Sequence, residues 1–262
     1  IDTVSKEEID KLVKNFKEYV LVSSKDKVGI DDLKSKIIKH LEDGEEEKPL
    51  VGDLLEYGSK VVLVVPIDSE APKGRIILPQ VQVIRDCLDH GIKTYVVRDT
   101  ELKEAIGELK DIDLVITDSQ AFKEVDSIIP KDLKLTSFSI LFARQKGELD
   151  EFLKGIKKLD TLKPNDKILI CESCSHNVSH EDIGRVKIPN MLRKIAGGDL
   201  NIEYMVGYDF KENVEDYDLI IHCGACMVNR KSVLNKISAC KEKNVPITNY
   251  GMVIAYFTKI LD

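Results

Sequence analysis

Two cysteine pairs are the residues of this 262-residue chain best suited to chemistry. Cys171 and Cys174 form one CxxC pair, and Cys223 and Cys226 form the other. Thiolate sulfurs bind zinc and iron–sulfur clusters, and the CxxC spacing lets two sulfurs reach one centre. The two pairs therefore predict a metal site or a redox dithiol.

Each pair directly follows a run of aliphatic residues, at 168–170 and at 219–221. Strands of one parallel sheet end on the same side, and ligands of such sheets bind beyond the carboxyl ends of the strands. Cys174 and Cys223, which lie 49 positions apart, can then converge. Structural zinc ribbons place their pairs about 15–20 residues apart, so the long gap disfavours a small zinc knuckle.

Three interpretations of the pairs remain open from the residues alone. An iron–sulfur cluster is favoured over zinc. The first alternative is a binding module stabilised by zinc on all four of these cysteines, and the second is a thiol redox protein that uses Cys223 and Cys226. The other two cysteines, Cys87 and Cys240, lie on apolar faces of expected helices and are predicted to be core residues.

The elements that must position these cysteines alternate between strand and helix from residue 60 onward. Expected strands or β-rich runs span 61–67, 93–97, 114–116, 135–142, 167–170, 202–206, 219–221 and 245–248. Expected helices span 79–90, 102–109, 121–129, 148–158, 189–196, 230–243 and 252–261. This alternation predicts an α/β fold of two mostly parallel sheets with helices on both faces.

The first 43 residues read differently, as helix, short strand at 19–22, loop and helix. A charged stretch at 43–49, rich in residues that break helices, predicts a linker to the rest of the chain. The segment resembles the last piece of a larger α/β domain.

Composition excludes several classes of function. The net charge is −7, from 39 basic and 46 acidic side chains, and no extended basic patch appears, which argues against nucleic-acid binding. The longest aliphatic run, 61–67, is far shorter than the roughly 20 residues of a membrane-spanning helix. The polar start has no signal-peptide pattern, and a cytoplasmic protein is expected.

The cysteines and their neighbouring histidines also carry a family resemblance. Cys174-x-His176, a gap of 45 residues, and then His222-Cys223-x-x-Cys226 is similar to the CxH…HCxxC signature of the HydF family, the maturation GTPases of FeFe hydrogenase. The stretch 64–86 resembles the dimerisation domain of the same family.

The resemblance implies a domain layout. Residues 1–45 would be the C-terminal remnant of a Ras-like GTPase domain plus a linker, 46–150 a dimerisation domain, and 151–262 the cluster-binding domain. Val22-Ser23-Ser24-Lys25 resembles the SAK-type loop of such domains, while the Walker A pattern GxxxxGK(S/T) is absent. The expectation is a truncated chain with no catalytic activity of its own, whose parent binds GTP in the missing N-terminal domain.

The resemblance also implies a cofactor and partners. The family binds a 4Fe–4S cluster through three cysteines, which correspond to Cys174, Cys223 and Cys226. It forms a homodimer, receives a transient two-iron precursor cluster from partner radical maturation enzymes and delivers it to apo-FeFe-hydrogenase. Cys171 lies outside the signature, as a bystander thiol or a rival fourth ligand.

The fourth iron would keep an exchangeable ligand, and we expect Glu181, because a carboxylate binds thiolate-ligated iron weakly. A solvated loop acid is the alternative for Glu181. His176 and His222 are predicted to act beside the cluster, as hydrogen-bonding neighbours or in cargo transfer.

Overall fold

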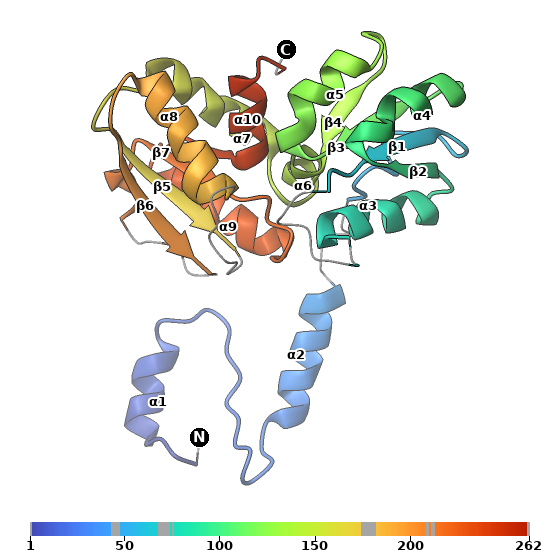
Figure 1. Cartoon of the computed structure of the whole chain (residues 1–262). Coiled ribbons are helices and arrows are strands. Elements are labelled where there is room, and N and C mark those ends of the chain that lie inside the picture. The colour runs from blue at the N-terminus through green and yellow to red at the C-terminus, as the bar shows by residue number, and fades with distance from the viewer. Residues whose placement is uncertain are drawn as a thin grey trace. The chain divides into compact units, whose positions relative to one another are not determined.

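The computed structural model describes residues 2–42, 48–67, 74, 76–173, 182–207, 210 and 213–260 (Figure 1). Backbone contacts divide the chain into two units, residues 1–47 and residues 48–262.

The first unit holds two helices, α1 (Lys6–Val13) and α2 (Ile30–Glu42). Helix α1 begins with a capping box, in which the Ser5 hydroxyl and the Glu8 carboxylate each accept a backbone N–H. The strand predicted at 19–22 is wrong: the described structure contains no strand at these residues, and only a single antiparallel bridge joins Ser23 to Val28 nearby. A strand forms only where its backbone pairs along a neighbouring segment, and the described part of this unit contains no such pairing beyond that single bridge.

The second unit contains two four-stranded sheets whose strands are all parallel, which confirms the predicted fold class. The first sheet has the order β2-β1-β3-β4, with bounds Lys93–Val97, Lys60–Val64, Leu114–Thr117 and Leu135–Ser137. The second has the order β6-β5-β7-β8, with bounds Asn201–Val206, Lys167–Glu172, Leu219–His222 and Ile247–Asn249. Both sheets therefore have the same topology. The strand order reverses between the strands that come first and third in the sequence of each sheet, β1 and β3 in one and β5 and β7 in the other.

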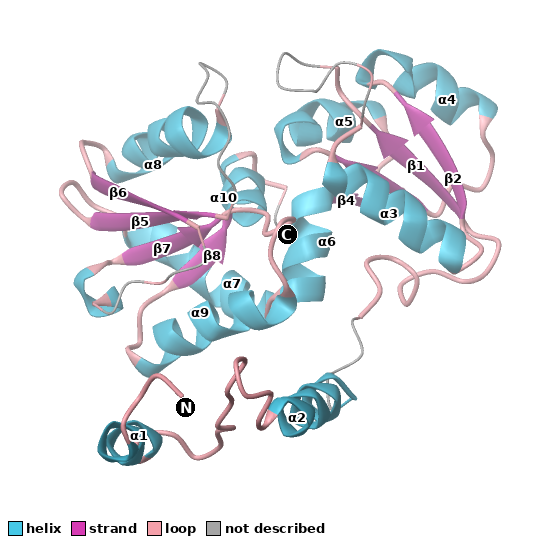
Figure 2. Cartoon of the chain, turned by 90° about the horizontal axis from the view of Figure 1, so that it is seen from below, coloured by secondary structure: helices cyan, strands magenta, loops and turns pink. Residues whose placement is uncertain are grey.

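Helices lie beside both sheets (Figure 2). Their bounds are α3 Leu78–Asp89, α4 Leu102–Glu108, α5 Phe122–Ile128, α6 Phe138–Lys146, α7 Leu149–Ile156, α8 Ile188–Ala196, α9 Arg230–Glu242 and α10 Tyr250–Phe257. Short 3-10 turns span Asp99–Glu101, Ser119–Ala121, Lys157–Thr161 and Val214–Asp216, and a π-helical turn, Ile183–Lys187, leads into α8.

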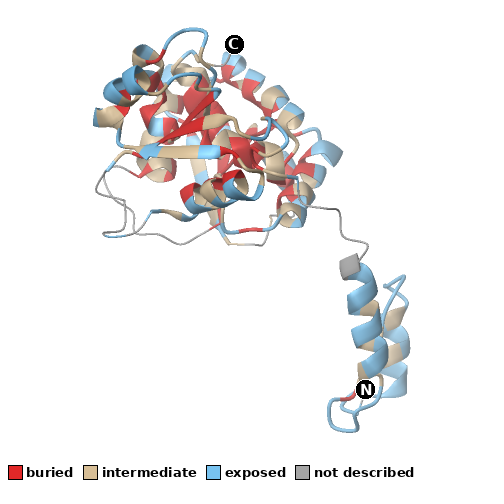
Figure 3. Ribbon diagram, turned by 90° about the vertical axis from the view of Figure 1, so that its right-hand side faces the viewer, coloured by how far each residue is buried: buried red, intermediate tan, exposed pale blue. Residues whose placement is uncertain are grey.

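The central strands of both sheets are buried on both faces (Figure 3). In β1, Val61 and Leu63 pack with α3 and α6, while Val62 and Val64 pack with α4 and α5. This burial explains the continuous aliphatic runs, since a parallel strand covered on both sides has no solvent face. Cys87 and Cys240 are fully buried, which confirms their prediction as core residues.

The β-rich run predicted at 135–142 is wrong beyond Ser137. Strand β4 ends there, and the Ser137 hydroxyl accepts the Ile140 N–H at 3.3 Å, which caps the start of α6. Phe138, Leu141 and Phe142 are buried at spacings that suit one face of a helix. Among the described residues, no helix is long and apolar enough to cross a membrane.

Candidate metal centre

The two cysteine segments meet where the strand order of the second sheet reverses. Strands β5 and β7 are parallel neighbours, with Cys171 in register with His222. Just beyond their ends, the Cys223 N–H donates to the Cys171 carbonyl at 2.9 Å, and the Ser173 N–H donates to the Cys223 Sγ at 3.3 Å. Ligands of open parallel sheets bind in this position.

The surroundings of Cys223 lower the pKa of its thiol. Burial raises its pKa, but hydrogen bonding and charge from His222, with hydrogen bonds from Ser173 and the Ala225 backbone, outweigh burial and lower the pKa to about 6. Its Sγ lies 3.3 Å from the Ser173 hydroxyl. The thiolate, the form that binds a metal, is therefore the main form of Cys223 at pH 7.

A tight turn carries the second thiol. We call residues 223–228 the cysteine turn. Ala225 has a φ of +57°, a left-handed conformation that larger side chains adopt reluctantly. Burial and the neighbouring Cys223 raise the pKa of Cys226, so this thiol holds its proton more tightly than Cys223.

His222 lies beneath the cysteine turn and is 1% exposed. Its Nδ1 is 2.8 Å from the Cys223 carbonyl oxygen, and its Nε2 is 3.4 Å from Nζ of Lys236, itself buried. Since a carbonyl oxygen only accepts, His222 donates to it from Nδ1. In the described structure His222 therefore holds the start of the cysteine turn through the Cys223 carbonyl.

Three of the predicted site residues, Cys174, His176 and Glu181, lie in the segment 174–181, outside the described residues. Both ends of that segment are described. Before it, the buried Glu172 carboxylate accepts two hydrogen bonds from Arg185, at 2.7 and 3.2 Å. After it, the Asp182 carboxylate accepts the Arg185 N–H at 2.7 Å.

The structure adds residues that no sequence pattern pointed to, foremost Tyr250 and Glu172. The Tyr250 hydroxyl and the Glu172 Oε1 are buried without a hydrogen-bond partner in the described part of the molecule. A side-chain Cβ on Gly184 would lie 2.1 Å from the first and 2.9 Å from the second, so glycine keeps the space between them open. Burial, with the charge of Cys223, raises the pKa of Tyr250, which keeps its hydroxyl protonated as a donor.

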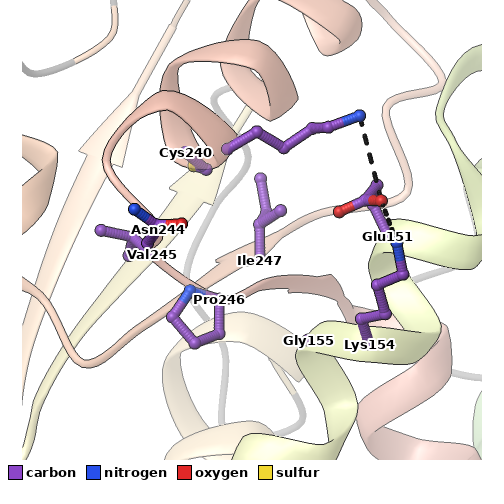
Figure 4. A pocket seen from close by; sticks show the side chains of 9 residues that line it. Glu151, Lys154, Gly155, Cys240, Asn244, Val245, Pro246 and Ile247 are labelled. Carbon is purple, nitrogen blue, oxygen red and sulfur yellow. Dashed lines mark hydrogen bonds and ion pairs between the residues drawn. The ribbon is translucent and has the colours of Figure 1, made fainter.

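A pocket of about 150 Å³ adjoins the cysteine turn. Gly224, Cys226 and Tyr250 line it from the second sheet's side, and Asp118 and Ser139 from the first. The carboxyl ends of strands from both sheets thus border one space. A second pocket, of about 400 Å³, lies between α7, α9 and β8, and none of the predicted site residues lines it (Figure 4).

The donor set fits a thiolate-bound metal in part. Cys223 and Cys226 provide two thiols, and the unpartnered polar atoms of Tyr250 and Glu172 leave hydrogen-bonding capacity beside them. Within the described ranges, no three His, Cys, Asp or Glu side chains come close enough to hold a metal ion. A metal centre on Cys223 and Cys226 would therefore need a further ligand from beyond the described residues. Cys171 is fully buried in the core of the second sheet, a position that favours the bystander interpretation.

The pKa values predict a sharp difference in reactivity between cysteines of the metal-free protein. Alkylation by iodoacetamide requires the thiolate, so the rate at Cys223 should rise through a midpoint near pH 6. Cys226, whose pKa is raised above the usual 9, should react only in more alkaline solution. Mass spectrometry of the modified peptides gives both profiles, and a Cys223 midpoint near pH 9 would contradict the geometry described here.

Two parallel sheets flanked by helices, with a cysteine turn just beyond the end of a central strand of the second, define an α/β protein with a candidate thiol site at the reversal point of that sheet. The chain belongs to the hydrogen maturase F (HydF) family. Residues 50–147 match the hydrogen maturase F dimerization domain, and residues 150–262 match its tetramerization domain. The family assigns the chain a role in hydrogenase maturation, and the two domain names indicate self-association.

No curated protein matches the chain. Among solved structures, O-succinylbenzoate coenzyme A synthetase from Bacillus subtilis, in complex with AMP, is 11% identical, with 77% of this chain and 62% of that chain covered and a TM-score of 0.28. A 5,10-methylenetetrahydrofolate dehydrogenase from the silkworm Bombyx mori is 14% identical, with 87% and 91% covered and a TM-score of 0.25. The present chain spans less than two thirds of the first structure, and neither score supports an argument about fold or function.

Proposed function

We propose that this protein is a scaffold in FeFe-hydrogenase maturation, which binds a 4Fe–4S cluster and delivers a two-iron precursor to apo-hydrogenase. One observation carries the proposal. The Cys223 thiolate and Cys226 lie at the reversal point of a parallel sheet, next to the segment that leads into Cys174. Thiolates are the ligands that iron–sulfur clusters take.

In this proposal Cys174, Cys223 and Cys226 hold three irons, and the fourth iron keeps an exchangeable ligand, Glu181. An exchangeable site suits a carrier, because a cargo must be accepted and then released. His176 would lie close to the cluster and hydrogen-bond its sulfurs or the cargo. His222, whose ring nitrogens both have partners, would orient the cysteine turn through its contact with the Cys223 carbonyl.

The finer assembly is also proposed. The family domains would occupy residues 46–150 and 151–262, and the chain would form a homodimer in the cytoplasm. Residues 1–45 would be the C-terminal part of a Ras-like GTPase domain plus a linker. Partner radical enzymes would supply the precursor cluster.

Anaerobic reconstitution with iron and sulfide tests the proposal. The protein should become brown, bind about four irons and four sulfides per chain, and give a reduced-state electron paramagnetic resonance signal. Glu181→Ala should keep the iron but change that signal. Glu104→Ala is the control: Glu104 lies in α4, which packs on the first sheet, and its replacement should change neither the iron content nor the signal. Colourless protein with one tightly bound zinc would instead support the four-cysteine zinc module, and an unchanged signal would remove Glu181 as a ligand.

A further inference from the structure

A lysine side chain from a helix that packs on the first sheet reaches the cysteine turn, which follows a strand of the second sheet. Lys146 is the last residue of α6, and its side chain is only 9% exposed. Its Nζ donates to the carbonyl oxygens of Ala225 at 3.0 Å, Cys226 at 3.2 Å and Val228 at 2.9 Å. An ammonium group has three N–H donors, and three carbonyls of the turn converge on this one.

This arrangement differs from that of an ordinary surface lysine. Burial of an ammonium is costly unless its hydrogens are bonded, so a lysine at this position is ordered together with its acceptors. The Phe142 ring, one helical turn earlier, lies 5.0 Å from Nζ and adds a cation–π contact. The turn, whose Ala225 has a positive φ, thus has its carbonyls fixed by a group from outside its own sheet.

Helix α6 is itself held against the second sheet's half at both ends. Near its C-terminus, Arg230 at the start of α9 donates from Nη1 to the Gln145 carbonyl at 2.6 Å. Near its N-terminus, Asn249 donates from Nδ2 to the Ser139 carbonyl at 3.2 Å. Figure 2 shows α6 between the two sheets. Side chains of other elements therefore hold the backbone of α6, and they fix the position of Lys146 independently of its own side chain.

We propose that Lys146 is a positioning residue for the cysteine site: its ammonium orders the cysteine turn and places a positive charge against the backbone of Cys226. A residue of α6, the helix that packs on the first sheet, thereby supports a site whose cysteines belong to the part of the chain that forms the second sheet. The charge part of this inference rests on the proposed function, since it concerns an anionic thiolate-bound cluster. The ordering part does not, because the three hydrogen bonds exist without any bound group.

Amide hydrogen exchange on the metal-free full chain tests the ordering. In Lys146→Met, peptides covering 224–229 should exchange at least about tenfold faster than in the wild type, because the turn loses its anchor. Exchange in β6, at the far edge of the sheet, should stay unchanged. Lys241→Met is the matched control: Lys241 also bonds across to the segment after α6, at Glu148, 3.0 Å away, but does not contact the turn. Equal exchange of the turn in wild type and Lys146→Met would overturn the proposal.

A measurement without mutation covers the case in which Lys146→Met does not fold. Nitrogen-15 NMR of the wild type should show one slowly exchanging lysine ammonium with couplings across its hydrogen bonds to the carbonyl carbons of residues 225, 226 and 228. Absence of those couplings would also overturn the inference.

The reconstituted protein tests the charge. Lys146→Met should lose iron to a chelator about tenfold faster and should have a lower midpoint potential, because a neighbouring positive charge stabilises the reduced cluster. Lys146→Arg keeps the charge and should keep a potential near that of the wild type. If wild-type protein takes up no iron, the proposed function fails, while exchange and NMR still decide the role of Lys146. An unchanged potential in Lys146→Met would refute the charge contribution.

Discussion

Cys223→Ala is expected to lower the iron bound after anaerobic reconstitution at least roughly tenfold, to the level of protein without a cluster. The fold prepares Cys223 for metal binding, since its pKa is lowered to about 6 and the Ser173 N–H donates to its sulfur. Alanine removes that thiolate and leaves two of the three proposed cysteine ligands. Iron and sulfide analysis with visible absorption gives the result directly.

Two controls make the cysteine experiment specific. Cys240→Ala removes the same chemical group from the buried face of α9, where burial raises the pKa of the thiol to about 12. This variant should leave the iron content unchanged. Cys171→Ala separates the two metal hypotheses: a cluster on three cysteines should survive it, whereas a zinc site on four cysteines should not. Full iron binding by Cys223→Ala would refute the ligand assignment.

The sheets could be predicted because their signal is local and repeated. Aliphatic runs such as 61–65 and 219–221 became central parallel strands, as continuous burial requires. Cys223 could be located at a strand end for the same reason, since it follows such a run, whereas Cys171 lies within β5 and Cys174 lies outside the described residues. The error at 135–142 has a local cause as well: Ser137 both ends a strand and caps a helix, and the apolar residues on either side suit both structures.

The residues that surround the thiols could not be predicted in this way. Lys146 ends an apolar helix and reads in the sequence as a solvated C-terminal lysine, but 79 positions separate it from the nearest carbonyl it binds. Tyr250 opens a helix that is apolar along its length, so its pattern predicts core packing. Their roles depend on how two sheets lie against each other, and that information is in tertiary contacts. The same dependence makes the joining elements, α6 and α7, the places where small changes should have large effects.

Gly155→Ala is expected to destabilise residues 48–262 by about 3 kcal/mol, the upper range for overpacking a core. Helix α7 packs so closely on β8 that a Cβ on Gly155 would lie 1.9 Å from the Ile247 carbonyl oxygen and 2.5 Å from its carbonyl carbon (Figure 4). The contact is with strand backbone, which cannot rotate away as a side chain would, so helix and sheet must separate. For a unit of this size the melting temperature should fall by about 6–12 °C.

Gly107→Ala is the matched control for this effect. Gly107 lies in α4, and a Cβ added there has no atom within 4 Å. Alanine favours a helix over glycine by roughly 1 kcal/mol, so this variant should melt slightly above the wild type. The intrinsic helical gain is common to both substitutions, and the difference between their melting temperatures therefore measures the cost of the close approach at Ile247. Equal melting of the two variants would mean that α7 does not pack on β8 as closely as described.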